Sequence, residues 1–384
     1  MLKKIRVGLV VPDSQNWLGG KNYILNLART LCSQHGTSIE LVIFCSPEDE
    51  IEVRDSLNLQ HIVILSDKIF TAVYFRLRLL ETILFGRQAA FTKLLQKNNV
   101  DTYFESIYFA GWRPGVRVIS WIPDFQHKKF PGFFSRTSWV LRELQIRLKL
   151  ICRDSFIFSS KDALNDFEKY YGKQAQKKSL YVAPFAIDKE SEAKVAGKES
   201  LSDYDLPNEY FIVCNQMWRH KNHLLVVQAV DILKRRGYEA SVLFTGSLRS
   251  GSDLKVYYEI KNKIKSLQLT GDIRILGTIP YCDVLGLISQ SIALINPSKF
   301  EGWNTSVEEA LLLQRPIIAS NLTVHLEQLS DSALYFSPDN AEQLANQMAL
   351  FLDRKYSYEH RGMLAYSERR NRFLKNLLIA LEVD

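Results

Sequence analysis

The chain has 384 residues, of which 46% are hydrophobic, and its formal net charge is +7. This length is sufficient for two ordinary domains that each bury a core, which excludes a miniature fold that depends on disulfide staples. None of the five cysteines has the spacing of a metal site or of a CxxC pair, so we expect small buried thiols in a reducing compartment. They are Cys32, Cys45, Cys152, Cys214 and Cys282.

The amino-terminal sequence and the charge distribution bear on location and partners. Asp13 breaks the first apolar run too early for a signal peptide or a membrane span, so we expect a soluble, cytoplasmic chain. Residues 61–178 hold about 20 Lys and Arg against about 10 Asp and Glu. This basic stretch lacks the signatures of nucleic-acid-binding folds, so we expect no nucleic acid partner. It favours a phosphate-bearing lipid acceptor or peripheral contact with an anionic membrane, such as the inner face of the plasma membrane.

Short apolar runs alternate with helical patterns along the whole chain. The first half contains IRVGLVV, SIELVIFC, HIVIL, TYFES, RVISWIP, FIFSS and LYVAPF, and the second contains YFIVCNQ, SVLFTG, IRILGTI, SIALINPS and RPIIAS. Many of these runs are apolar on both faces, which is typical of parallel strands covered by helices on both sides. They predict an α/β protein with two Rossmann-like, doubly wound parallel sheets, whose ligand site lies at the carboxyl ends of the strands, in a cleft between the domains.

The polar segment 187–209 is the natural boundary between the two sets of strands. We therefore expect a first domain over residues 1–188 and a second over residues 189–365. A last helix, at about 366–384, is expected to pack back on the first domain.

The first candidate ligand site is the sequence WLGGKNYILNLARTL after the first strand. Gly19 and Gly20 allow close approach of the backbone, and the helix that follows offers free N–H groups to a phosphate. An ordinary glycine turn is the alternative, because the GxGxxG spacing is missing.

The second candidate is the loop in CNQMWRHKNHLLVV, which follows a strand and precedes a helix near Asn222. Arg219 and Lys221 stand at the helix start, where cations oppose the dipole unless an anion binds there. Two cations beside free amides suit a diphosphate, and a solvated basic turn is the alternative. His220 and His223 make a weak metal pair without a third ligand.

The third candidate is FEGWNTSVEEA, residues 300–310, between a strand and a helix that Thr305 or Ser306 can cap. We expect Glu301 in the loop and Glu309 about two turns into the helix. The loop amides from Asn304 to Ser306 then act as donors. Glu309 can accept both hydroxyls of a ribose, and Glu301 can accept hydroxyls of a sugar. We interpret the neighbouring Glu308 as plain helix surface.

These residues resemble a known enzyme family. Glu301 and Glu309, with seven residues between them, are similar to the EX7E pattern of retaining GT-B glycosyltransferases of the GT4-like kind, the glycosyl transferases group 1. EEALLLQRPIIASN and SALYFSPDNAEQLANQM also resemble segments of that family. The resemblance covers essentially the whole chain and is strongest over residues 211–348.

The resemblance implies a role for each matched position. Glu309 is expected to bind the nucleotide ribose, Glu301 the donor sugar, and Lys221 the phosphates. Gly19 and Gly20 correspond to the glycine loop of the family.

Two positions depart from the family pattern. Gln216 stands where the family usually has an arginine, so Arg219 is expected to serve instead. The common EGFG is EGWN here, which places Asn304 at a glycine position and bears on the donor-sugar contacts.

The first domain is expected to hold the acceptor. WIPDFQHKKFPGFFS resembles the PDxQH segment of many family members, so we predict that His127 contacts a reacting sugar or the acceptor, supported by Asp124. A purely structural histidine is the alternative. The apolar run with interspersed Arg and Lys at residues 68–97 is either a core helix or a membrane-surface helix.

The predicted function is therefore a retaining glycosyltransferase. It transfers a mannose-, glucose- or rhamnose-like sugar from a nucleotide diphosphate sugar to a hydroxyl of a glycan or lipid-linked glycan in polysaccharide biosynthesis. Glu301, His127 and Lys221 are the expected catalytic residues, and no metal or other cofactor is expected. Asp203 and Asp205 form a DxD sequence that we interpret as a surface turn. The alternatives are a GT-B epimerase or hydrolase of nucleotide sugars and a non-catalytic protein that binds them.

Overall fold

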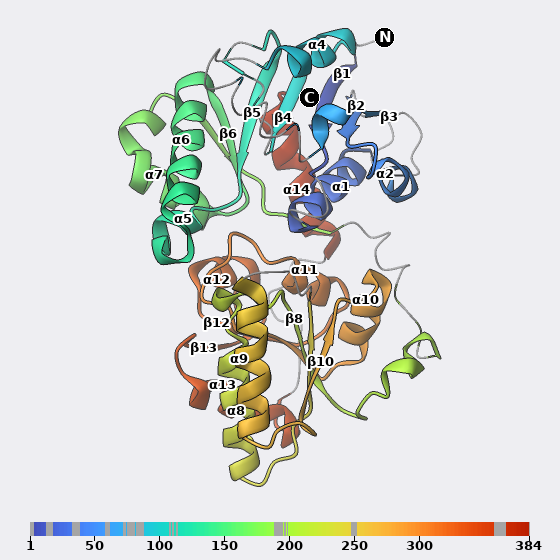
Figure 1. The fold of residues 1–384 in the computed structure, drawn as a ribbon, viewed down its shortest axis with the longest axis vertical. Coiled ribbons are helices and arrows are strands. Elements are labelled where there is room, and N and C mark those ends of the chain that lie inside the picture. Colours follow the sequence, from blue (N-terminus) through green and yellow to red (C-terminus); the bar gives the residue numbers. More distant parts are fainter. Residues whose placement is uncertain are drawn as a thin grey trace. The chain divides into compact units, whose positions relative to one another are not determined.

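The computed structural model divides into two compact units, which are described separately (Figure 1). Unit 1 comprises Met1–Asp188 and Arg369–Asp384, and unit 2 comprises Lys189–Glu368. The structure describes residues 4–12, 18–32, 39–57, 62–71, 88–106, 114–187, 199–246, 252–356 and 366–383, together with the single positions 74, 81, 109, 111, 112, 195 and 197. The basic run at 68–97 falls largely outside these ranges.

Unit 1 is built on a sheet of seven parallel strands in the order β3-β2-β1-β4-β5-β6-β7. The strands are β1 (Ile5–Val10), β2 (Ile39–Cys45), β3 (Ile62–Ser66), β4 (Thr102–Glu105), β5 (Arg117–Ile122), β6 (Ser155–Phe158) and β7 (Ser179–Val182). Their central members are almost wholly buried, because helices cover both faces of the sheet.

Helices connect these strands and complete unit 1. They are α1 (Leu18–Cys32), α2 (Glu50–Ser56), η1 (Lys68–Phe70), α4 (Ala89–Lys97), α5 (Gln126–Lys129), η2 (Pro131–Phe133), α6 (Arg136–Cys152) and α7 (Lys161–Ala175). The last helix, α14 (Tyr366–Leu381), returns to this unit. Arg117 of β5 donates hydrogen bonds to the carbonyl oxygens of Ala380 and Leu381, and the ring of Phe373 contacts Tyr23 and Phe185.

Unit 2 is built on six parallel strands in the order β10-β9-β8-β11-β12-β13. The strands are β8 (Phe211–Cys214), β9 (Val242–Thr245), β10 (Ile273–Gly277), β11 (Ala293–Asn296), β12 (Ile317–Ser320) and β13 (Leu334–Phe336). The helices are η4 (Glu199–Tyr204), η5 (Arg219–Lys221), α8 (His223–Arg235), α9 (Ser252–Ser266), α10 (Tyr281–Gln290), α11 (Thr305–Leu312), α12 (Thr323–Leu329) and α13 (Ala341–Leu352).

The core of unit 2 lies on both faces of its sheet. Side chains of α8, α9 and α13 pack on one face, and those of α10 and α11 pack on the other (Figure 1). The order of the strands reverses between β8 and β11, so the loops that follow these two strands meet at the topological switch point, where open α/β sheets bind ligands.

The prediction of two parallel, doubly wound sheets is confirmed. Each of the twelve apolar runs forms a strand, whereas the short β13 was not expected as one. Over the part of the chain that the structure describes, no helix combines the length and the hydropathy needed to cross a membrane.

Candidate functional site

The loop after β8 is fixed by an asparagine at the start of α8. Asn222 adopts a left-handed conformation with φ of 60°, and its Nδ2 donates hydrogen bonds to the carbonyl oxygens of Pro297 and Pro338 at 3.0 and 2.8 Å. Those two carbonyls belong to the loops that follow β11 and β13. Gly246, directly after β9, leaves room for the loop after β8, because a Cβ there would lie 2.2 Å from the carbonyl oxygen of Asn215. The hydrogen bonds of the Asn222 side chain thus hold three strand-end loops together.

Lys221 and Glu301 form a close ion pair at this switch point. The Nζ atom of Lys221 lies 2.7 and 2.8 Å from the two carboxylate oxygens of Glu301. Ser298 Oγ and Asn304 Nδ2 donate to the same carboxylate at 2.6 and 2.8 Å. Burial alone would raise the pKa of Glu301, but Lys221, His325 and the hydroxyl of Ser298 hold it below its ordinary value. The structure therefore brings together two expected site residues that are far apart in the sequence.

Arg219 lies on η5 but does not join this pair. Its Nη2 atom donates hydrogen bonds to both carboxylate oxygens of Glu259 on α9 at 3.0 Å, and its side chain is 56% exposed. This geometry corresponds to a solvated surface ion pair. Gln216, the position of the usual arginine in the family, lies in the loop after β8 and is partly buried.

The cap of α11 is different from the one expected. The side chain of Asn304, and not that of Thr305 or Ser306, accepts the hydrogen bond from the amide of Val307, at 3.0 Å. Ser306 donates to the same oxygen at 2.8 Å and is buried, while Thr305 is exposed. Asn304 can therefore cap the helix with its oxygen and hold Glu301 with its nitrogen, two roles that glycine could not provide.

Glu309 is a buried carboxyl group near the start of α11. It is the fifth residue of the helix, so it lies one turn from the start and not the expected two. Burial raises its pKa to about 8, and a hydrogen bond with Tyr281 only partly opposes this effect. Near neutral pH the carboxyl group is mostly protonated, and a ligand that donates hydrogen bonds to it would favour the charged form.

The interpretation of Glu308 as helix surface is wrong. Its side chain is fully buried and accepts hydrogen bonds from Gln328 Nε2 at 2.8 Å and from the hydroxyl of Tyr366 at 3.4 Å. Gln328 also donates to the carbonyl oxygen of Asn304 at 2.9 Å. Glu308 therefore holds α12 and the start of α14 against the loop that carries the candidate site.

The glycines of the first candidate site lie in the first turn of α1. Gly19 is exposed and Gly20 is buried, while residues 13–17 before them fall outside the described ranges. Lys21 follows as a fully buried cation, whose Nζ lies 2.8 Å from Asp49 and 2.7 Å from Glu52. Burial lowers the pKa of Lys21, but these two carboxylates more than offset it and raise the pKa overall. Sequence reasoning did not single out this cluster.

His127 and Asp124 lie at the carboxyl end of β5, beside α5. Asp124 accepts the amide hydrogen of Gln126 at 2.9 Å and so stabilises the start of α5. The side chain of His127 is 1% exposed, and its Nε2 lies 3.6 Å from Glu143. Burial and the neighbouring Arg142 lower its pKa. The ring is thus neutral and closed to solvent in this structure, packed near Trp139.

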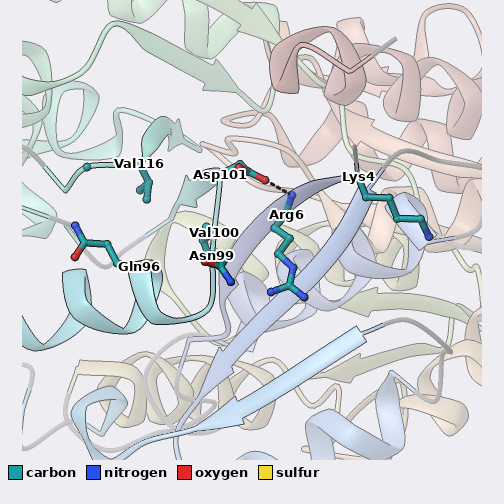
Figure 2. Close-up of a pocket in the computed structure, with 8 residues that line it drawn as sticks. Lys4, Arg6, Gln96, Asn99, Val100, Asp101 and Val116 are labelled. Atoms are coloured by element: carbon teal, nitrogen blue, oxygen red, sulfur yellow. Dashed lines mark hydrogen bonds between the residues drawn. The ribbon is translucent and has the colours of Figure 1, made fainter. Parts of the chain in front are cut away.

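A hollow of about 600 Å³ lies at the opposite edge of the sheet in unit 1. Figure 2 shows Arg6 at its centre, with Lys4, Asp101 and Val116 around it. Asp101 accepts the backbone amide of Arg6 at 2.9 Å, so the visible contact stabilises the start of β1. This hollow is at the amino ends of the strands and includes none of the expected site residues.

No three His, Cys, Asp or Glu side chains gather into a possible metal site in the described ranges. Asp203 is exposed at the end of η4, and the carbonyl oxygen of Asp205 accepts hydrogen bonds from Arg274. The two aspartates lie next to the boundary segment, before β8.

Comparison with known families identifies this arrangement. The family model of "Glycosyl transferases group 1" matches residues 202–371, which is almost all of unit 2 and includes the whole Lys221–Glu301 site. Residues 202–371 thus match the sequence pattern of the group 1 glycosyltransferases.

Known relatives agree with this assignment. The O-antigen chain mannosyltransferase RfbU of Salmonella typhimurium is 24% identical to this chain over 192 residues. That match covers 47% of this chain and 52% of the relative, so it spans about half the length of the relative.

Solved structures share the fold over nearly the whole chain. A glycosyltransferase from Rickettsia africae has a TM-score of 0.68 at 17% identity and covers 99% of this chain and 98% of its own. Anabaena HepE, in complex with UDP and glucose, has a TM-score of 0.66 at 12% identity and covers 98% and 95%. These likenesses show that the chain has the GT-B fold.

Two polar neighbours of the Lys221–Glu301 pair were not expected. His325 of α12 is fully buried and its Nδ1 lies 2.8 Å from the carbonyl oxygen of Ser320; it also contributes to lowering the pKa of Glu301. Ser298 donates to Glu301 directly. Ser298 stands within the PS that precedes Glu301, so its position in the sequence gave a weak signal, whereas His325 gave none.

Proposed function

We propose that this chain transfers a sugar from a nucleoside diphosphate sugar to a hydroxyl group of a glycan acceptor, with retention of the anomeric configuration. The observation that carries the proposal is the buried Lys221–Glu301 pair at the switch point between β8 and β11. A cation beside the start of α8 suits an anionic leaving group, and a carboxylate held by three donors suits sugar hydroxyls.

Lys221 is proposed to bind the diphosphate. In this structure its Nζ atom donates hydrogen bonds to both carboxylate oxygens of Glu301. A diphosphate would draw the ammonium group toward itself, while Ser298 and Asn304 remain as donors to the carboxylate. The leaving diphosphate gains negative charge in the transition state, so Lys221 and the helix-start amides stabilise that state more than the ground state.

Glu309 is proposed to bind the two ribose hydroxyls of the nucleotide. Its carboxyl group is buried on α11, the helix that starts directly after the loop of Glu301. The amides of Thr305 and Ser306 in the first turn of the same helix are proposed as further donors to the ligand. Arg219 could reach an anion only after leaving Glu259, so we assign it a lesser role than Lys221.

The chain offers Lys221 and backbone amides where a metal-dependent transferase would place carboxylates. We propose that transfer needs no metal ion, and turnover should therefore survive EDTA. A strict requirement for added Mn²⁺ or Mg²⁺ would contradict this part of the proposal.

Unit 1 is proposed to hold the acceptor near Asp124 and His127, and Gly19 and Gly20 are proposed to contact the donor phosphates. His127 is 1% exposed, so its contact with a sugar hydroxyl requires the ring to become accessible when substrate binds. The relative RfbU is named for mannose transfer to an O-antigen chain. By analogy we propose a lipid-linked glycan of polysaccharide biosynthesis as the acceptor, with the enzyme in the cytoplasm and in peripheral contact with a membrane.

The anomeric configuration of the product decides the stereochemical part of the proposal. Retention without a covalent intermediate lets the departing phosphate accept the acceptor's proton, and Glu301 is expected to hold hydroxyls and not to attack carbon. Proton NMR of the product should show an α-linked sugar from an α-linked donor. An inverted product would refute retention, and a sugar trapped on Glu301 would replace the direct route with a covalent one.

The measurement also separates transfer from the two other activities considered. An epimerase or hydrolase forms product from donor without acceptor, and a non-catalytic protein binds donor without turnover. Product formation that depends on the acceptor supports the proposed transfer.

A further inference from the structure

The outer side of α6 carries an unusual concentration of exposed apolar side chains. Thirteen large hydrophobic residues are exposed in the described ranges, and five of them lie on η2 and α6. They are Phe133, Val140, Leu141, Leu144 and Ile151. The side chains of Ile151 and Val140 are 71% and 55% exposed. Single exposed apolar residues are normal in soluble proteins, but a cluster on one helix indicates an interaction surface.

Helical geometry places these residues on one side. At 3.6 residues per turn, Val140, Leu144 and Ile151 fall on one stripe, and Leu141 lies beside it. The other side packs inward, where Leu150 joins the core of unit 1 and the Nζ atom of Lys149 donates a hydrogen bond to the carbonyl oxygen of Ser106 at 3.1 Å. The stripe of Val140, Leu144 and Ile151 is therefore an apolar side of α6 that unit 1 leaves exposed.

The charge of α6 is positive wherever the helix is exposed. Arg136, Arg142 and Arg147 are all exposed, and no acidic side chain of the helix is. Glu143, its one acidic residue, is buried and already contacts Arg147 at 2.7 Å and Lys128 at 2.8 Å. Within the described part of the chain, neither Arg136 nor Arg142 makes a salt bridge to an acidic residue.

We propose that this outer face of α6 docks unit 1 on an anionic membrane surface. The docking face consists of Val140, Leu141, Leu144 and Ile151, with Arg136 and Arg147 beside the stripe, whereas Arg142 lies on the other side of the helix, over the ring of Phe134. A helix with an apolar stripe and basic flanks lies in the plane of a lipid interface, with its stripe among the headgroups and upper acyl chains. Arg136 and Arg147 then meet the phosphates of anionic lipids. This inference depends on the proposed function in one respect: a lipid-linked acceptor would bring the enzyme to a membrane surface.

A membrane accounts for both features of the docking face. Pairing with a second copy would bury the apolar stripes but would also bring arginines of both helices together, and like charges at an interface disfavour association. The basic balance of residues 61–178, which contain α6, points in the same direction. An anionic bilayer satisfies the stripe and the arginines at once.

Sedimentation with lipid vesicles tests the proposal without donor or acceptor, so its outcome is independent of sugar transfer. The chain should co-sediment with vesicles that contain phosphatidylglycerol and phosphatidylcholine, and much less with phosphatidylcholine alone. The double variant Leu141→Ser/Leu144→Ser should weaken binding at least tenfold. Arg136→Gln/Arg147→Gln should weaken it by roughly fivefold for each arginine removed, and 0.5 M salt should also reduce the binding of the wild type.

Matched variants elsewhere serve as controls. Leu326→Ser removes a leucine of α12 that is 47% exposed, close to the 40% of Leu144, and Arg372→Gln removes an exposed arginine of α14 in the same unit. Both controls should bind vesicles like the wild type.

Three outcomes would overturn the proposal. They are no binding to anionic vesicles, equal loss in the control and α6 variants, and a wild-type dimer in sedimentation equilibrium that Leu141→Ser/Leu144→Ser converts to a monomer. The last result would assign the face to self-association. Circular dichroism of each variant separates lost binding from lost folding.

Discussion

Replacing Glu309 by glutamine should change how stability depends on pH. Burial raises the pKa of Glu309 from 4.5 to about 8, so between these values the folded protein holds a proton that the unfolded chain has released. The wild type therefore loses stability as pH rises through this window, by about 1.4 kcal/mol per pH unit. From pH 5 to pH 8 the loss amounts to about 4 kcal/mol. Glutamine carries no titrating group, so Glu309→Gln should lack this slope.

Urea denaturation of both proteins at pH 5, 6, 7 and 8 measures the effect. The variant should gain about 4 kcal/mol relative to the wild type over this range, and the difference should level off above pH 8. Glu239→Gln, which removes an exposed carboxylate of the same unit, is the control and should show no such trend. A difference between Glu309→Gln and wild type that is constant with pH would refute the burial argument.

Three further predictions concern the same site. Binding of a nucleoside diphosphate at pH 7 should release close to one proton, because ribose hydroxyls favour the charged form of Glu309. Calorimetry in two buffers of different ionisation enthalpy measures this release, and none is expected in Glu309→Gln. Lys221→Met should lower the free energy of unfolding by about 3–5 kcal/mol, because Glu301 keeps a buried charge without its cation. The same variant should slow turnover by about 10²–10³. Unchanged stability would mean that the pair is not buried in solution. Asn304→Ala should lower the free energy of unfolding by about 2–4 kcal/mol, because it removes both the cap of α11 and a donor to the buried carboxylate of Glu301. Asn304→Ser keeps a capping oxygen and should be more stable than Asn304→Ala by about 1 kcal/mol, whereas equal loss in both variants would reject the capping role.

The strands were predictable because they are short, apolar on both faces and bounded by polar loops. β13 was not predicted, because it has only three residues and two of them are partly exposed. It therefore lacks the continuous apolar pattern of a buried strand. Its pairing with β12 comes from the sheet and not from its own sequence.

The candidate site was predictable only in part. Strand ends place Lys221 and Glu301 at the same edge of a sheet, but their direct contact across 80 positions depends on the pairing of β8 with β11 and on Asn222. Glu308 was misjudged because helical spacing assigns one side to solvent, whereas residues Ser306 to Leu312 of α11 are all buried.

Exposure of side chains at strand ends could not be read from the sequence. His127 stands in a polar segment, yet its ring is closed off by residues that come from α6, including Glu143 and Trp139. The burial of His127 depends on how α6 packs against it, so the residues next to His127 in the sequence do not predict it.

Titration calorimetry of UDP, GDP and ADP is the most direct test of the proposed donor site. The account predicts that at least one of them binds the wild type, and that Lys221→Met weakens binding by roughly tenfold or more because a charge-assisted contact to the diphosphate is lost. Absence of binding by all three, or equal affinity in wild type and variant, would contradict the assignment of Lys221 and its loop to a nucleoside diphosphate sugar.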